Sequence, residues 1–191
     1  MFGDLFENVH FAFIFSASAM FIAGLYFAPT IVEKNIRWLL VYPRWVARLM
    51  EKYFSTKWGF FPLFLTILIL NNISLFTGFV SGYGIVFPLL FAFFTGLNVS
   101  VIGYDLMGWQ GLWHMLVNPI AWLEFPAAWI SFGMGLQLGW DILSRGDYSV
   151  AGQTFAILLP IYFKYVFTLL LIAAILEAIG IIIAEKHRDQ L

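Results

Sequence analysis

The sequence of 191 residues contains no cysteine, and only 11% of its residues are charged. Without cysteine the chain has no disulfides, no thiolate chemistry and no zinc or iron–sulfur centre with cysteine ligands. A net charge of -1 and the lack of a long basic run argue against nucleic acid as a partner, because phosphate binding requires clustered Lys and Arg. Soluble domains carry about a quarter charged residues, so this composition excludes an ordinary soluble domain.

Signatures of catalysis are also missing from the sequence. HExxH, GxSxG and GxxxxGK[ST] motifs do not occur, and these motifs mark metalloproteases, serine hydrolases and nucleotide-binding loops. His10, His114 and His187 fall at different predicted depths, so no two of them are placed to hold a haem iron or a zinc ion. We therefore expect a protein that is not an enzyme and that carries no cofactor and no metal.

Apolar side chains dominate instead, at 62% of the residues with 20% aromatic and a mean hydropathy of +0.88. A helix crosses a hydrocarbon core of about 30 Å with about 20 apolar residues. This pattern predicts an all-α integral membrane helix bundle that forms one transmembrane domain over residues 1–191. The five spans are expected at about 10–32, 59–80, 85–106, 112–140 and 154–184.

The charged residues that do occur are concentrated between the first two spans. Arg44, Arg48 and Lys52 recur every four residues among tryptophans and leucines, which predicts an amphipathic helix at about 36–54 lying in the membrane interface. The alternative is a simple basic loop that sets topology. Because Lys and Arg favour the cytoplasmic side, we expect the N-terminus outside, the C-terminus in the cytoplasm and the chain in the plasma membrane.

Four polar residues lie within the predicted spans, namely Asn71, Asn72, Glu124 and Glu177. A charge at the bilayer centre costs about 2.5–3.5 kcal/mol on insertion scales, so such acids usually face other protein. At about 1.5 Å per residue the two acids reach similar depths, which predicts a buried Glu/Asn network. That network would be a set of hydrogen bonds that hold the helices together, a docking site for a partner, or a site for an ion or proton. Lys164 is predicted near the outer surface, away from Glu177.

The segment around Glu124 also carries helix-breaking and close-packing signals. Pro119 and Pro126 each remove a backbone donor, so they predict a kinked, broken or re-entrant fourth segment. Gly135 and Gly139 form a GxxxG face, which favours close helix packing. Gly78 and Gly82 form a second, weaker one. The sequence does not encode whether the partner of these faces lies within the chain or in a second copy.

Four motifs in this order and spacing resemble the stage II sporulation protein M family of multi-span membrane proteins. They are NNI at 71–73, PIAWLEFPA at 119–127, GMGLQLG at 133–139 and LEAIG at 176–180. The resemblance covers about Asn71 to Ala184, and the first seventy residues add little to it. Ile120 and Ala121 stand where the family usually has His and Gly, so this chain lacks the His of the family's His–Glu pair.

The resemblance implies a membrane scaffold, because the family's namesake is similar to an anchor for peptidoglycan-degrading enzymes during engulfment. We therefore expect a protein that contacts the lipid bilayer and binds other membrane or envelope proteins, or a second copy of itself, and no nucleic acid. The alternative is a small transporter or channel for ions or protons that uses Glu124 and Glu177.

Overall fold

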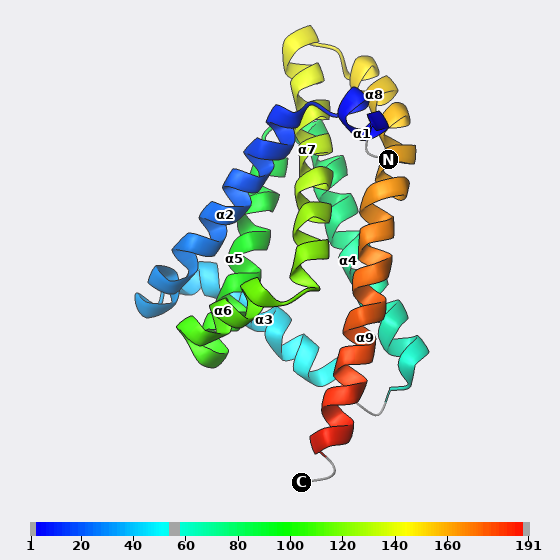
Figure 1. Ribbon diagram of the computed structural model, residues 1–191. Coiled ribbons are helices and arrows are strands. Elements are labelled where there is room, and N and C mark those ends of the chain that lie inside the picture. The colour runs from blue at the N-terminus through cyan, green and yellow to red at the C-terminus, as the bar shows by residue number, and fades with distance from the viewer. Residues whose placement is uncertain (1–2, 54–57, 189–191) are drawn as a thin grey trace.

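A computed structural model describes residues 3–53 and 58–188, and every regular element in those ranges is helical. This agrees with the predicted all-α membrane bundle (Figure 1). In chain order the elements are α1 (Gly3–Asn8), α2 (Phe11–Glu33), α3 (Arg37–Tyr53), α4 (Phe60–Val80), the 3-10 turn η1 (Ser81–Gly84), α5 (Phe87–Met107), α6 (Trp109–Val117), α7 (Ala121–Arg145), α8 (Tyr148–Ile161), the π-helical segment η2 (Tyr162–Phe167) and α9 (Thr168–Arg188).

Four helical stretches are long and apolar enough to cross a membrane. These are Phe11–Glu33, Phe60–Gly84, Phe87–Met107 and Tyr148–Ala184. The last consists of α8, η2 and α9 in one continuous rod. Pro160 lies just before its π-helical segment, where the missing proline N–H loosens the regular ladder of backbone hydrogen bonds.

The remaining predicted span, α7, differs from these four because it lies at the centre of the bundle. It contacts α2, α4, α5, α8 and α9, and Phe132, Met134 and Leu138 on it are fully buried. Its 25 residues extend about 37 Å at 1.5 Å per residue, which is more than the bilayer core of about 30 Å requires. Neighbouring helices shield α7 from lipid, so its sequence can carry more polar residues and glycine than the outer helices.

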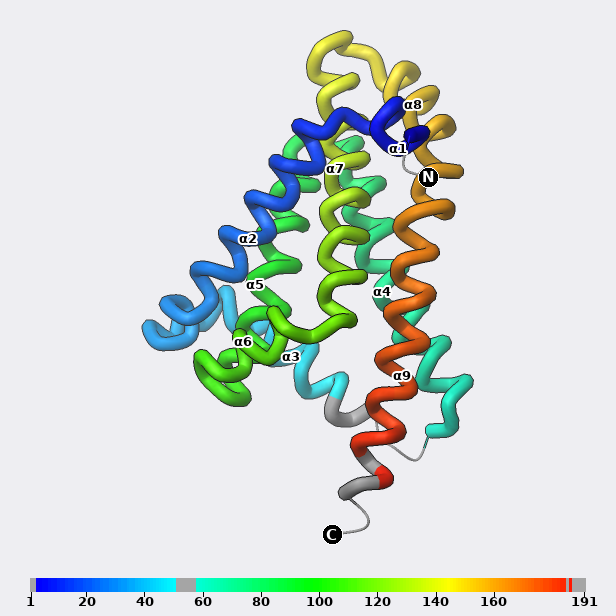
Figure 2. The backbone as a smooth tube through the Cα atoms, viewed as in Figure 1, coloured from blue at the N-terminus to red at the C-terminus, as the bar shows by residue number. Residues whose placement is uncertain are grey.

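The path of the chain places the two ends of the bundle apart (Figure 2). The N-terminus, α1, η1 and the α7–α8 turn lie at one end, whereas α3, α6 and the C-terminus lie at the other. We call these the α1 end and the α3 end. The two links between long helices at the α1 end, η1 and the α7–α8 turn, are short, while the links at the α3 end contain the two extra helices α3 and α6.

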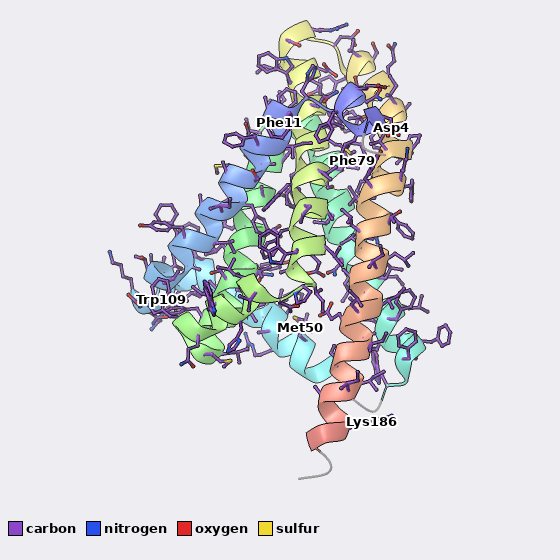
Figure 3. All side chains as sticks on the ribbon, viewed as in Figure 1. Asp4, Phe11, Met50, Phe79, Trp109 and Lys186 are labelled. Carbon is purple, nitrogen blue, oxygen red and sulfur yellow. The ribbon has the colours of Figure 1, made fainter. Side chains whose placement is uncertain are left out.

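Large aromatic side chains fill the interior and also cover the periphery (Figure 3). Phe79 is fully buried, and its ring stacks on that of Tyr162 with centroids 5.8 Å apart. Phe11 and Trp109 instead project from the bundle, with 63% and 67% of their surfaces exposed. This division is typical of a membrane bundle, in which lipid takes the place of water around outward-facing apolar groups.

Candidate functional site

The polar residues of α4 and α7 meet in one hydrogen bond at membrane depth. Asn71 Nδ2 on α4 donates to Glu124 Oε1 on α7 over 2.8 Å. Glu124 lies in the first turn of α7, directly after the chain turns out of α6. Asn71 lies about 16 Å from the start of α4, at 1.5 Å per residue. Asn71 therefore lies near the middle of α4, where α4 meets the start of α7.

Glu177 lies on α9, which packs against both α4 and α7. Both glutamates are half-buried rather than enclosed. The structure therefore does not support the prediction of a glutamate buried in a dry interior. The physical reason is position, since Glu124 begins α7 beside the α6–α7 turn instead of lying in the middle of a packed helix.

Asn72 does not join the Asn71–Glu124 pair. Its Nδ2 donates to the Leu68 carbonyl of its own helix over 3.1 Å, and the hydroxyl of Tyr162 lies 3.4 Å from both its carbonyl and its side-chain oxygen. Consecutive helical residues point about 100° apart, because a turn takes 3.6 residues. The predicted four-residue network is thus divided into an Asn71–Glu124 pair beside Glu177 and a separate Asn72–Tyr162 contact.

The two prolines around Glu124 act differently. The helix is interrupted at Asn118–Ile120, where Asn118 Oδ1 accepts a hydrogen bond from the backbone N–H of Ile120 over 3.0 Å. Pro119 lies in this interruption, as predicted. Pro126 lies inside α7, which continues through it, so the helix is not broken there, and the alternative of a kink at Pro126 stays a prediction. One missing backbone hydrogen bond near the start of α7 does not end a helix that is packed on several sides.

The glycine faces pack against each other within the chain. A Cβ added at Gly135 would lie 2.8 Å from the carbonyl oxygen of Gly78 and 2.9 Å from that of Phe79, and one added at Gly82 would overlap the carbonyl oxygen of Gly135. Gly139 approaches the backbone of Ile85 in the same way. The partner of α7 that the sequence left open is therefore the α4–η1 corner of the same chain.

Basic residues at the α3 end hold α3 against α5. Arg44 donates from Nε and from a terminal nitrogen to the two oxygens of Asp105, over 2.7 and 3.0 Å. Arg48 lies one turn later and donates from Nε to the Arg44 carbonyl over 3.1 Å. Arg44, predicted at the membrane surface, is thus engaged in a fork-like ion pair. The side chain of Lys52, the third predicted surface cation, lies outside the described residues.

At the α1 end, Lys164 pairs with Asp4 over 2.6 Å, far from Glu177. Tyr165 also donates to Asp4. The hydrogen bond from Lys164 is the main reason that the pKa of the Asp4 carboxyl lies below its usual value. Gln137 of α7 fastens the same region, since it donates to the Asn8 carbonyl over 2.8 Å and accepts from the backbone N–H of His10 over 3.0 Å.

A groove of about 320 Å³ opens between α4 and α5, with Tyr42 of α3 at its edge. Most of its lining is aromatic or aliphatic, but Ser74, Thr95 and Asn98 also line it. The side-chain oxygen of Asn98 is enclosed by protein and has no hydrogen-bond partner among residues 3–53 and 58–188. An unpaired polar atom at membrane depth is costly, which makes Asn98 the candidate contact residue of this groove.

Within the described ranges, no group of three or more His, Asp or Glu side chains is arranged to hold a metal ion. The polar groups present can accept and donate hydrogen bonds between helices, and Glu124 with Glu177 can carry charge. The geometry is thus suited to helix association or to binding a small cation.

A comparison with known protein families shows which family the chain belongs to. The family model of stage II sporulation protein M matches residues 11–180. The chain is a member of the stage II sporulation protein M family. No curated protein and no solved structure matches it. The match begins at the start of α2, so the view that the first seventy residues add little to the resemblance is wrong. In this family member α2 and α3 belong to the shared domain as much as α7 does.

Some site features were missed by sequence reasoning although signals for them exist. Gly24 and Gly96 bring α2 and α5 close together, since a Cβ at either would overlap the other helix's backbone. They do not form a GxxxG motif, but each is an isolated glycine within an apolar span, which is itself a sign of close packing. Asn98 is a lone amide in the third span, and the same argument that selected Asn71 would have selected it.

Proposed function

We propose that this family member is a membrane scaffold that binds a transmembrane helix of another membrane or envelope protein in the groove between α4 and α5. The observation that carries the proposal is the Asn98 amide, which lines the groove and whose oxygen, enclosed by protein, has no hydrogen-bond partner among the described residues. Lipid tails cannot form hydrogen bonds, so we expect a partner helix to bind where this amide can turn toward it and pair with a polar group of that helix.

The position of Asn98 fits such a partner. It lies eleven residues after Phe87 at the start of α5, or about 16 Å along the helix at 1.5 Å per residue, close to mid-membrane. Thr95 is one turn away on the same side and offers a second hydroxyl. The aromatic walls at Phe91 and Phe94 give the apolar contact on which helix association in lipid depends. The proposed activity includes no chemical step.

The orientation of the scaffold is part of the proposal. Basic α3 and the C-terminus lie at the same end of the bundle (Figure 1), whereas Arg145 and Lys164 lie toward the other. The excess of Lys and Arg at the α3 end supports a cytoplasmic α3 end in the plasma membrane, with α1 outside. A reporter fused to either terminus tests this: an outside C-terminus would contradict the orientation.

Co-purification from native membranes tests the scaffold. Tagged wild type, Asn98→Leu and Thr95→Val are compared with Thr66→Val, which removes a hydroxyl that bonds only the Pro62 carbonyl of its own helix. We expect a partner protein that co-purifies in near-equal amounts with wild type and with Thr66→Val. The amount that co-purifies with either groove variant should be about tenfold lower, in line with about 1.4 kcal/mol for a lost interhelical hydrogen bond. Identical sets of bound proteins for all four would contradict the proposal.

A second candidate function follows from the Asn71–Glu124 pair beside Glu177. Two acids and an amide at one place could pass a cation or a proton. Flux into proteoliposomes of wild type, Glu124→Gln and Glu177→Gln tests it. Flux above empty liposomes that both variants abolish would favour a transporter, whereas no flux for any tested ion would leave the scaffold as the function.

A further inference from the structure

A second cavity, independent of the partner groove, lies between α3 and α5 at the α3 end. It encloses about 340 Å³. Its polar lining consists of Arg44, Arg48 and Asp105, and Val101, Ile102 and Leu106 of α5 form an apolar wall. The cavity therefore combines a charged mouth with a surface suited to hydrocarbon.

The position of α3 indicates the level of this cavity in the membrane, because α3 lies across the base of the bundle (Figures 1 and 2). Trp38, Val41, Tyr42 and Trp45 project from α3 with half or more of their surfaces exposed. Tryptophan and tyrosine prefer the level of the lipid headgroups, and a helix with one apolar and one basic face lies in that plane. The mouth of the cavity is thus at headgroup level, with its apolar wall running along α5 into the bilayer.

The charges at the mouth leave an excess of one positive charge. Asp105 pairs with Arg44 over 2.7 Å, which cancels two of the three charges and fixes α3 to α5. Arg48 supplies the third. Only its Nε is engaged among the described side chains and backbone, by the Arg44 carbonyl. That bond orients the plane of the guanidinium and leaves its terminal nitrogens for an anion. A guanidinium in fixed orientation suits a phosphate better than an ammonium does, because it donates two parallel hydrogen bonds.

We propose that this cavity binds an anionic phospholipid, with the phosphate on Arg48 beside the Arg44–Asp105 pair and one acyl chain against Val101, Ile102 and Leu106. A phosphodiester bears one negative charge, which matches the excess charge at the mouth. A zwitterionic lipid would bring a further positive group to the two arginines. The bound lipid bridges α3 and α5 and strengthens the joint that the ion pair already makes.

Lipid-exchange measurements on the full chain in nanodiscs test the site. Native mass spectrometry counts retained phosphatidylglycerol and phosphatidylcholine in discs that contain both lipids in equal amounts. We expect wild type to retain phosphatidylglycerol in preference, and Arg48→Gln to lower that retention about tenfold or more, as befits the loss of charge-assisted hydrogen bonds. Arg48→Lys is expected to fall between the two.

Two controls separate this site from general charge attraction and from a simple anion site. Arg145→Gln removes an exposed arginine at the α1 end and should leave retention unchanged. Glycerol phosphate, which lacks acyl chains, should not displace the lipid at millimolar concentration. Equal retention of the two lipids by wild type, equal losses for Arg48→Gln and Arg145→Gln, or displacement by glycerol phosphate would each overturn the proposal. Unchanged elution in size-exclusion chromatography shows that the variants fold.

Discussion

The most direct test of the packing is Gly135→Ala, compared with Gly180→Ala. A Cβ at Gly135 would lie 2.8 Å from the Gly78 carbonyl oxygen, 2.9 Å from that of Phe79 and 3.0 Å from the ring of Pro88. Two of these three atoms belong to backbone, so the helices themselves would have to move apart. A Cβ at Gly180 on α9 would meet nothing within 4 Å, so the two substitutions add the same methyl group to opposite environments.

The magnitudes follow from two opposing effects. Replacing a helical glycine by alanine stabilises a helix by about 1 kcal/mol, and this gain applies at both positions. At Gly135 it is opposed by overpacking, which costs about 1–3 kcal/mol. We therefore expect Gly180→Ala to raise the free energy of unfolding by up to about 1 kcal/mol and Gly135→Ala to lower it by up to about 2 kcal/mol.

Reversible unfolding with SDS in mixed micelles, followed by tryptophan fluorescence, measures both variants against wild type. The difference between the two alanine variants is the decisive quantity, because it removes the shared helix-propensity effect. If Gly135→Ala were as stable as Gly180→Ala, the close contact between α7 and the α4–η1 corner would be refuted.

Three further predictions concern the polar contacts. Asn71→Leu should lower the free energy of unfolding by about 1–3 kcal/mol, because Glu124 keeps its partly buried position without its donor, and Glu124→Leu in the same chain should recover most of that loss in the SDS titration. Reversing either Arg44 or Asp105 should lower the melting temperature, whereas the double exchange should restore part of it, and a double variant no better than the singles would contradict the bidentate pairing. Asp4→Asn should speed amide hydrogen exchange in α1 near neutral pH and have no effect in acid. The pKa of the Asp4 carboxyl is lowered in the folded protein, so its contribution to stability is complete above the unfolded pKa near 4. That contribution is lost as the pH falls through the folded pKa.

The class of fold is predictable from the sequence because the bilayer requires it. Long apolar runs must be helical in lipid, since each backbone N–H and C=O must be satisfied within the span. The helices α2, α4 and α5 accordingly lie within a few residues of the predicted spans. The bounds of the fourth span were less accurate, because the interruption expected at Asn118 and Pro119 divides it into a short α6 and the longer α7.

The contacts of the polar residues were predictable only in part. Depth counting brought Glu124 and Glu177 to similar levels, but it could not tell that Asn71 bonds Glu124 whereas Asn72, one residue later, points toward Tyr162. Depth alone also does not reveal which helices are neighbours. Arg44 illustrates this, since its periodicity indicated a cation at the membrane surface and its partner Asp105 is 61 residues away in sequence.

The α7 helix shows why a hydropathy criterion fails to detect a span at the centre of a bundle. Glu124, Gln137 and three glycines lower its apolar content, and it is absent from the four stretches that satisfy length and composition. Those same residues are what other helices contact, because a surrounded helix needs close approach and hydrogen bonds more than it needs contact with lipid.

Site-directed photo-crosslinking tests the proposed scaffold function most directly. Because the chain contains no cysteine, a benzophenone maleimide attached to Leu90→Cys, an exposed position in the groove lining, labels the groove alone, and Phe61→Cys, an exposed position on α4, labels a lipid-facing control. In native membranes the groove probe should yield one protein adduct of defined mass, which Asn98→Leu abolishes and the control probe does not form. Lipid adducts alone at Leu90→Cys, or a protein adduct that persists with Asn98→Leu, would contradict the proposed partner-binding groove.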